Sequence, residues 1–268
     1  MSPSSPPAPE AGGRLKHAFI RRALRLLIRC YLRVRLTGLE RIPTDTPYLL
    51  CFSHPNWVDP FLLVSFWPDN PRVFIFGPRE EDMATGWRNR VIGWSQVAVP
   101  FKPSKSDLLD TTRRAMAVLN RGNVLAIAGE GRLSDREGAI VPLQDGAAFL
   151  ALRARVPVVP LAIIGTRWLR FGKRVTLRAG DPISTDGLRP DRPGVAALTV
   201  RIQSAMAGLL VGVEEDLPPG PFGRWVTDLF NERPWLKNGP RVDEVEGKHR
   251  RDIRSTRVPR GRARISRR

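Results

Sequence analysis

The 268-residue sequence has few of the residues that metal centres and disulfide frameworks require. It contains two cysteines, Cys30 and Cys51, and three histidines, and their spacing matches neither a metal-ligand cluster nor a disulfide pattern. We therefore expect no metal and no resident cofactor, and a reducing compartment is the default for a chain of this kind.

Residues 14–36 lack acidic side chains and lack any run of eighteen uncharged residues. This composition excludes a membrane-spanning helix, and the interspersed cations give no signal-peptide core. Arg21, Arg25, Arg29 and Arg33 recur every four residues, which predicts an amphipathic helix over 14–36. The apolar residues assigned to the opposing face are Leu15, Phe19, Ala23, Leu26, Leu27, Cys30, Tyr31 and Val34. We expect this helix to lie in a membrane interface; the alternative is a helix that packs on the core with its arginines in solvent.

The net charge of +18 belongs to the two ends of the chain. Residues 14–36 carry eight basic residues, residues 248–268 carry ten with one acid, and residues 37–247 carry 26 basic against 24 acidic residues. A nearly neutral body argues against a fold whose own surface binds nucleic acid. Basic ends favour an anionic membrane surface as the partner.

Composition divides the chain into five segments. Residues 1–13 are rich in Pro, Ser, Ala and Gly and are predicted to be disordered. The predicted helix 14–36 precedes one folded domain over 37–213, a loop-rich extension over 214–247 and a disordered basic tail over 248–268. Aromatic residues of the extension, including Trp225, would either pack on the body or enter a membrane interface.

The segment SHPNWVDP, residues 53–60, holds the strongest chemical signal. It follows the apolar run 48–52, which predicts a buried strand with His54 at its exit. Pro55 is suited to the first position of a helix, and Asp59 would then lie one turn inside it. A carboxylate on one ring nitrogen fixes the tautomer of His54 and leaves the other nitrogen as a general base. A capping Asp59 beside an inert loop histidine is the alternative.

A second signal follows the predicted buried strand that begins at Val124. That strand ends in Gly-Glu-Gly-Arg, residues 129–132. The carboxyl ends of such strands are where ligands bind in α/β sheets. The guanidinium of Arg132 suits a phosphate, and glycine lets a ligand approach the backbone. A structural Glu130–Arg132 ion pair is the alternative. Cys51 and Ser53 lie beside His54, but we assign them to strand packing and a turn.

These segments resemble the glycerolipid acyltransferases, the lysophosphatidate (1-acylglycerol-3-phosphate) acyltransferase family. His54 and Asp59 keep the His-x4-Asp spacing of the family's first motif, in which Ser53 and Asn56 replace the usual Asn and Ser. Glu130, Gly131 and Ser134 match the Phe-Pro-Glu-Gly-Thr-Arg-Ser motif, with the arginine one position early. Further matches are the Gly-x-Glu lead-in at Gly38, the Val-Pro-Val-Val-Pro segment at 156–160, and Gly165-Thr166.

The resemblance, which covers residues 32–185, implies an α/β domain with a mixed, mostly parallel sheet flanked by helices. It also implies transfer of an acyl group from acyl-CoA or acyl-carrier protein to a lysophospholipid hydroxyl, at the cytoplasmic face of a membrane. His54 would be the base and Asp59 its orienting partner. Glu130, Gly131 and Arg132 would bind the acceptor, with Lys102 as the counterpart of the second motif's arginine. The remaining alternatives are a catalytically silent membrane scaffold and nucleic-acid binding through the basic ends.

Overall fold

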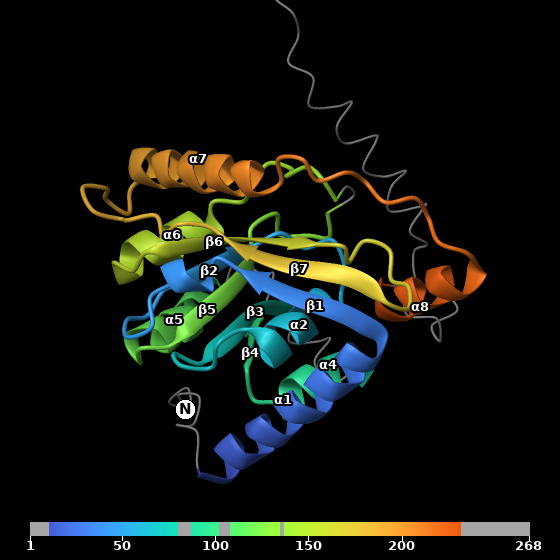
Figure 1. The fold of residues 1–268 in the computed structure, drawn as a ribbon. Helices are drawn as coiled ribbons and strands as arrows, with labels where there is room; N and C mark the ends of the chain where they lie inside the picture. The colour runs from blue at the N-terminus through green and yellow to red at the C-terminus, as the bar shows by residue number, and fades with distance from the viewer. Residues whose placement is uncertain (1–10, 80–86, 102–107, 135–136, 232–268) are drawn as a thin grey trace, which may run out of the picture.

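The computed structural model describes residues 11–79, 87–101, 108–134 and 137–231. Its centre is a seven-stranded sheet in the order β1-β7-β6-β2-β5-β3-β4 (Figure 1). The strands are β1 (Leu32–Thr37), β2 (Leu49–Phe52), β3 (Val73–Arg79), β4 (Ala98–Phe101), β5 (Val124–Ala128), β6 (Val158–Ile164) and β7 (Lys173–Ala179). All neighbouring strands are parallel except β6 and β7, which pair antiparallel. The predicted mixed, mostly parallel sheet is therefore confirmed.

Helices cover both faces of this sheet (Figure 1). They are α1 (Ala11–Tyr31), α2 (Asp59–Phe66), α4 (Trp87–Trp94), α5 (Leu108–Asn120), α6 (Gly146–Ala154), α7 (Arg192–Leu209) and α8 (Pro221–Asn231), with a short 3-10 turn at Leu39–Arg41. One apolar cluster joins the sheet to α2 and the end of α1, and the other joins it to α5, α6 and α7. Two layers of helices on a mostly parallel sheet make an α/β sandwich.

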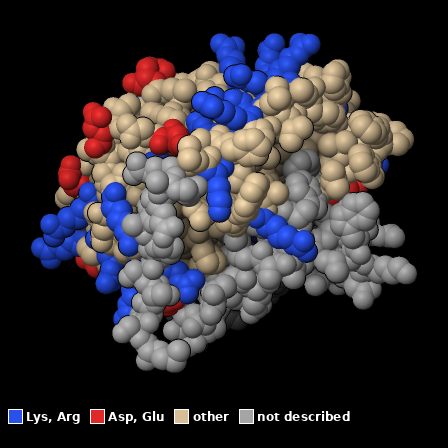
Figure 2. Space-filling model, turned by 90° about the horizontal axis from the view of Figure 1, so that it is seen from below, with Lys and Arg blue, Asp and Glu red and all other residues tan. Residues whose placement is uncertain are grey.

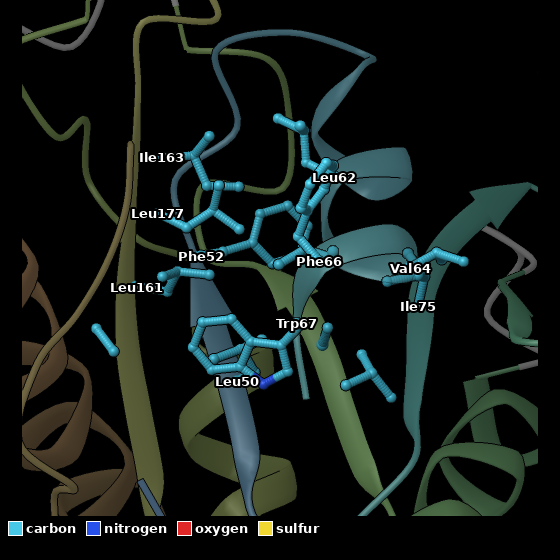
Figure 3. Close-up of a cluster of buried hydrophobic side chains, with 14 of the residues drawn as sticks. Leu50, Phe52, Leu62, Val64, Phe66, Trp67, Ile75, Leu161, Ile163 and Leu177 are labelled. Carbon is cyan, nitrogen blue, oxygen red and sulfur yellow. The ribbon is translucent and has the colours of Figure 1, made fainter. Parts of the chain in front are cut away.

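Strand β2 lies at the centre and supplies side chains to both clusters. Leu50 and Phe52 pack with residues of α2, whereas Leu49 and Cys51 face the opposite layer, because successive side chains of a strand alternate. Figure 3 shows Leu50 and Phe52 beside Trp67 in the first cluster. Burial of each large apolar side chain contributes about 1.5–3 kcal/mol. A strand buried on both faces reads as one unbroken apolar run, which is why it was recognisable in the sequence.

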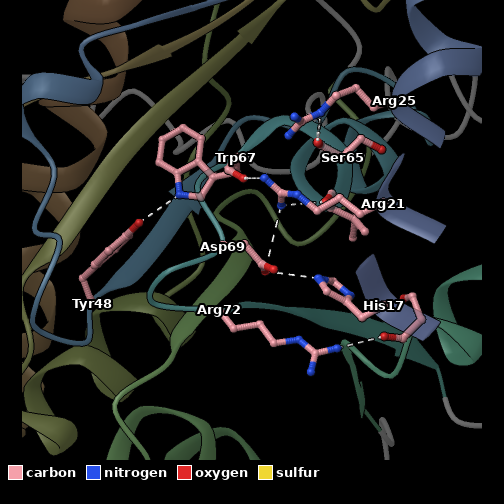
Figure 4. Close-up of polar contacts among 10 residues, drawn as sticks. His17, Arg21, Arg25, Tyr48, Ser65, Trp67, Asp69 and Arg72 are labelled. Carbon is pink, nitrogen blue, oxygen red and sulfur yellow. Dashed lines mark hydrogen bonds and ion pairs between the residues drawn. The ribbon is translucent and has the colours of Figure 1, made fainter. Parts of the chain in front are cut away.

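Helix α1 docks on the body through its cations (Figure 4). Arg21 donates from Nη1 to the carbonyl of Val64 at 3.0 Å and from Nη2 to that of Trp67 at 2.5 Å. Arg25 donates from Nε to the carbonyl of Ser65 at 2.8 Å. These carbonyls lie at the end of α2, where a helix leaves its last acceptors unpaired and carries partial negative charge. Arg21 and Arg25 therefore act as a cap for α2.

The arginine contacts leave apolar side chains of α1 on the outside. Leu15, Phe19, Leu26 and Leu27 are each at least 66% exposed, whereas His17 and Ile20 are buried. The alternative of a core-packed helix with its arginines in solvent is wrong for Arg21 and Arg25, since both bind the body. Among the described residues, no helix has the length and apolar composition that crossing a bilayer requires.

The predicted boundaries of the N-terminal helix are corrected at both ends. Helix α1 already begins at Ala11, inside the segment predicted to be disordered, and it ends at Tyr31 rather than at residue 36. Residues 32–37 form the edge strand β1, paired in parallel with β7. Leu32, Val34 and Leu36 alternate with arginines, which is a period of two and the pattern of a strand. Val34 and Arg33 therefore belong to the sheet.

Other boundaries differ from the sequence-based expectation by smaller amounts. Helix α2 begins at Asp59 instead of Pro55, and residues 55–58 form turns. The extension predicted to be loop-rich over 214–247 contains helix α8. The predicted basic tail lies outside the described residues.

Candidate active site

The site lies where the turns after β2 and β5 meet. Phe52 and Ala128, the last residues of these strands, are paired in register, so both turns begin at the same edge of the sheet. The amide of Ser134 donates to the carbonyl of His54 at 2.7 Å, and the amide of Gly129 donates to that of Phe52 at 3.1 Å. The fold thus brings together two motifs that lie about eighty residues apart in the sequence.

His54 and Asp59 form a direct pair. His54 Nδ1 lies 2.9 Å from Asp59 Oδ2, and the amide of Asn56 donates to the same carboxylate oxygen at 2.8 Å. With Asp59 ionised, Nδ1 carries the proton and Nε2 keeps the lone pair that a general base needs. The ring of His54 is held edge-on between those of Phe52 and Trp57, with centroid distances of 5.7 and 5.4 Å.

Asp59 reaches His54 from the first turn of α2. The segment between them folds back through the Asn56 side chain, whose Oδ1 accepts from the amide of Val58 at 2.9 Å, and the amide of Asp59 donates to the Asn56 carbonyl at 3.0 Å. A side chain at the start of a helix points back along the chain, which directs the carboxylate at the ring. The predicted pairing therefore holds although the helix begins four residues later than predicted.

Complete burial raises the pKa of Asp59, because a buried carboxylate loses its hydration. The hydrogen bond and charge of His54 and the amide of Asn56 oppose this rise. The hydroxyl of Thr166, from the turn after β6, also lies close enough to lower the pKa of Asp59. Its alignment is poor, since neither Thr166 Oγ1 nor Asp59 Oδ1 has a regular hydrogen bond within the described part of the chain.

The second motif forms the wall beside this pair. Glu130 is buried, and its Oε1 accepts a hydrogen bond of 2.6 Å from the hydroxyl of Ser134. Gly131 has a left-handed backbone with φ of 67°, a conformation that glycine adopts without steric cost. Arg132 follows with an exposed side chain. The structure therefore places Glu130, Gly131 and Arg132 in the turn next to His54, while Lys102 lies outside the described residues.

Cys51 and Ser53 are held in structural roles. Burial, with a smaller effect from the charge of Glu130, raises the pKa of the Cys51 thiol to about 12, so it stays protonated at neutral pH. Its Sγ contacts the sulfur of Met206 at 3.7 Å. Ser53 Oγ accepts from the amide of Ile163 at 2.9 Å and continues the pairing of β2 with β6. These contacts agree with the assignment of both residues to packing and a turn.

Glu137 is a site residue that sequence reasoning missed. It is buried, and its carboxylate accepts hydrogen bonds from the amides of Gly165 and Arg167, on either side of Thr166. Burial raises the pKa of Glu137 above its ordinary value, although these amides and Lys173 oppose the rise. Glu137 thereby fixes the turn that carries Thr166 to Asp59. The position of Gly165-Thr166 after a buried strand was a usable signal, but nothing in the local sequence distinguishes Glu137.

The described part of the chain holds no group of three or more His, Cys, Asp and Glu side chains that could bind a metal ion. Cys30 is exposed and Cys51 is buried, and neither forms a disulfide. The chemistry available at this edge of the sheet is therefore that of an oriented imidazole beside a buried carboxylate and an exposed guanidinium. Such a set can take a proton from a hydroxyl group and bind an anion.

Comparison with known proteins agrees with this chemistry. The family model described as Acyltransferase matches residues 33–164, which include both motifs. Residues 33–164 therefore match this acyltransferase family. The T. maritima crystal structure of the 1-acyl-sn-glycerophosphate (LPA) acyltransferase PlsC superposes with a TM-score of 0.55 at 20% identity, covering 74% of this chain and 78% of that one. The two proteins therefore share a fold.

Similar curated proteins come from plants, yeast and mammals. The chloroplastic 1-acyl-sn-glycerol-3-phosphate acyltransferase BAT2 of Brassica napus is 25% identical over 162 residues, which are 56% of this chain and 43% of that protein. The 1-acyl-sn-glycerol-3-phosphate acyltransferase of Saccharomyces cerevisiae is 25% identical over 181 residues, 64% of this chain and 58% of its own length. The chain thus spans about half the length of these two relatives.

Proposed function

We propose that the chain transfers a fatty acyl group from an acyl thioester to the free hydroxyl of lysophosphatidate or a related lysophospholipid. The observation that carries this proposal is the buried pair of His54 Nδ1 and Asp59 Oδ2 at 2.9 Å, in the turn after β2. The match of residues 33–164 to the acyltransferase family supports the reaction class. The names of the Brassica and yeast relatives support 1-acylglycerol-3-phosphate as the acceptor.

The reaction we propose needs one general base and no covalent intermediate. His54 Nε2 takes the proton from the acceptor hydroxyl while the oxygen attacks the thioester carbonyl. The tetrahedral intermediate collapses with cleavage of the carbon–sulfur bond, and the protonated imidazole returns its proton to the thiolate. The products are an ester and a free thiol. General-base catalysis of this kind is worth about 10²–10⁴ in rate. The buried thiol of Cys51, with its raised pKa, is unsuited to an acyl-enzyme.

In this mechanism Arg132 binds the acceptor phosphate, with Lys102 as a second cation. An arginine fork donates two parallel hydrogen bonds to a phosphate, and the exposed side chain of Arg132 can reach a lipid headgroup. Glu130 is fixed by Ser134 and so positions the turn on which Arg132 stands. The oxyanion would form next to this glycine-lined turn, where the backbone permits close approach.

We further propose that the protein works at the cytoplasmic face of a membrane as a peripheral or monotopic enzyme. Helix α1 supports this proposal, because Arg21 and Arg25 bind the body while Leu26, Leu27 and Phe19 face outward. An apolar face flanked by cations is typical of helices that lie in the interface of anionic bilayers. Figure 2 views the molecule from the side of α1 and shows Lys and Arg along the upper rim and across this face.

The test is acyl transfer by the purified full chain, with radiolabelled acyl-CoA and acyl-carrier protein offered separately. Lysophosphatidate in mixed vesicles would be the acceptor, and lysophosphatidylcholine would be the matched acceptor without an exposed phosphate monoester. We expect labelled phosphatidate from at least one donor and much slower transfer to lysophosphatidylcholine. Transfer that is equal for both acceptors would contradict the role of Arg132. No transfer with any donor would contradict the proposed reaction and favour a silent scaffold.

A further inference from the structure

Four aromatic side chains lie toward the end of the sheet at which His54 follows strand β2. Tyr31 and Phe171 meet edge-to-face with ring centroids 6.0 Å apart, and Phe222 and Trp225 stack on α8 at 5.9 Å. We call this set the aromatic corner. Phe171, Phe222 and Trp225 are 76%, 64% and 53% exposed. A single exposed aromatic residue is ordinary on a soluble protein, but a group of them marks an interaction surface.

Hydrogen bonds join the three segments of the aromatic corner. The amide of Gly172 donates to the carbonyl of Tyr31 at 2.8 Å, which ties the end of α1 to the turn before β7. The amide of Leu169 donates to Thr227 Oγ1 at 2.8 Å, which ties the same turn to α8. Figure 1 shows α8 beside the junction of α1 and β1. The corner is therefore continuous with the end of the outward-facing helix α1.

The turn at the centre of the corner is basic. Residues 167–174, RWLRFGKR, contain four cations and no acid. Arg167 and Lys173 form ion pairs with Glu215 and Asp216, whereas Arg170 and Arg174 are exposed on either side of Phe171. Aromatic rings next to cations are the composition that favours the headgroup layer of an anionic bilayer, where the rings bury their apolar part and the cations meet phosphates. A purely apolar protein partner would leave these two arginines without compensating charge.

The aromatic corner also lies next to the proposed catalytic residues along the chain. Thr166, which approaches the Asp59 carboxyl, is three residues from Leu169 and five from Phe171. Arg167 Nη1 donates to the carbonyl of Ser134, in the turn of Glu130, at 3.4 Å. A membrane that covers the corner would therefore border the site itself, and a lipid acceptor could reach His54 without passing through bulk water.

We propose that the aromatic corner, with Arg170 and Arg174, is a second membrane-contact surface that inserts its rings into an anionic lipid interface beside the active site. The occupant is the bilayer surface. This inference rests on the proposed function in one respect: the role of the surface, which is to give a lipid acceptor access to the site, assumes the proposed reaction. Membrane contact through the corner is a separate property that can be measured without any turnover.

The experiment is co-sedimentation of the full chain with vesicles of phosphatidylcholine and phosphatidylglycerol. The double variant Phe171→Ala/Trp225→Ala should bind these vesicles about tenfold more weakly than wild type, since two rings lose their place in the interface. The control is Leu109→Ala/Val200→Ala, which removes two equally exposed side chains, 69% and 68%, from the opposite helical layer. It should bind like wild type. Equal binding by the double variant and its control would overturn the proposal.

A charge variant and a spectroscopic readout complete the test. Arg170→Gln/Arg174→Gln should lose affinity for vesicles with phosphatidylglycerol but not for phosphatidylcholine alone, and added salt should reduce the difference. Brominated lipid should quench wild type more than Trp225→Phe. If the rings instead contact a second copy of the chain, the double variant will have a different mass in solution from wild type. If they contact the segment 232–268, the quenching of Trp225 by iodide will depend on whether that segment is present. Either result without a change in vesicle binding contradicts the proposal.

Activity separates this inference from the proposed function. With a short-chain, monomeric acceptor, Phe171→Ala/Trp225→Ala should turn over like wild type, while its rate on vesicle-bound acceptor falls with its binding. Loss on both acceptors in a folded protein would contradict a role limited to membrane contact. If wild type shows no acyl transfer but Phe171→Ala/Trp225→Ala still binds vesicles more weakly than wild type, the result would support the membrane-contact surface and contradict the proposed reaction.

Discussion

The protein contains two buried histidines among its described residues, and each pairs with an aspartate. His54 Nδ1 lies 2.9 Å from Asp59, and His17 Nε2 lies 3.1 Å from Asp69. The first pair lies in the turn after the central strand β2, whereas the second joins α1 to the segment after α2 (Figure 4). The residue types are the same, so the place in the fold and the surroundings decide which pair can do chemistry.

The two aspartates differ in their surroundings and therefore in their pKa. Asp59 is fully buried, and burial raises its pKa. Asp69 has a side chain that is 37% exposed, and the hydrogen bond of His17 and the charge of Arg21 outweigh its partial burial and lower its pKa. His54 thus pairs with a fully buried carboxylate that has no cation as a second partner among the described residues, while His17 shares its carboxylate with Arg21, which fixes α1. The comparison teaches that a His–Asp distance alone does not identify a base.

The largest difference between the pairs should come from neutralising each aspartate. Asp59→Asn removes the group that holds the His54 tautomer, so the rate of acyl transfer should fall by about 10²–10⁴. Asp69→Asn should leave the rate within a small factor of wild type, because this residue fastens α1 to the body. Steady-state kinetics on both variants, with circular dichroism as the check of folding, measure the contrast. Similar rate losses in both would break the comparison.

A smaller effect is expected in the turn beside the first pair. Arg132→Gln should raise the KM for lysophosphatidate about tenfold or more, since a charged hydrogen bond is worth about 1.5–3 kcal/mol, and should change kcat less. Arg132→Lys should recover part of the lost affinity for lysophosphatidate, because lysine keeps the positive charge but cannot donate the two parallel hydrogen bonds of a guanidinium. Arg201→Gln, an exposed arginine of α7, is the control and should behave as wild type. An unchanged KM for Arg132→Gln would remove it from acceptor binding.

Thr166→Val tests the support of the first pair at nearly constant volume. The hydroxyl lies close to the Asp59 carboxyl without a well-aligned hydrogen bond, so its loss should lower kcat only about two- to tenfold. The rate should recover in Thr166→Ser, which restores the hydroxyl. A valine variant that is as active as wild type would show that Asp59 is held by His54 and Asn56 alone.

The smallest expected effect is a difference in how stability depends on pH. A raised pKa contributes stability that is lost as pH rises through it. The free energy of unfolding of Asp59→Asn should therefore increase relative to that of wild type as pH increases above 3.8. A lowered pKa contributes stability that is lost as pH falls through it. The free energy of unfolding of Asp69→Asn should therefore increase relative to that of wild type as pH decreases below 3.8. Urea unfolding across this range measures both slopes. Slopes of the same sign would contradict the assigned surroundings.

The pairing of His54 with Asp59 could be predicted from the sequence because the two residues are close together in the chain. A buried strand, a histidine at its exit and an aspartate five positions later are all visible in one segment, and the error in the start of α2 did not change the pairing. Glu130, Gly131 and Arg132 were found for the same reason, as they follow the buried strand β5 directly.

The residues that were missed depend on contacts between distant parts of the chain. His17 and Asp69 are separated by 52 positions, and Glu137 reaches the turn of Thr166 across 28 positions. The direction in which α1 faces was also not predictable from periodicity, since a helix with an arginine stripe and an apolar face can dock by either one. Helix α1 docks through its arginine face because the carbonyls at the end of α2, which have no partner within that helix, accept hydrogen bonds from Arg21 and Arg25.

The most direct test of this account is to remove each histidine in turn and measure acyl transfer to lysophosphatidate. His54→Ala should lose at least about a hundredfold in kcat while the protein stays folded, because no other described residue places an aligned base at the site. His17→Ala should keep kcat and unfold at a lower temperature, because it loses the contact of α1 with Asp69. Wild-type activity in His54→Ala, or an equal loss in a folded His17→Ala, would contradict the claim that His54 is the catalytic base.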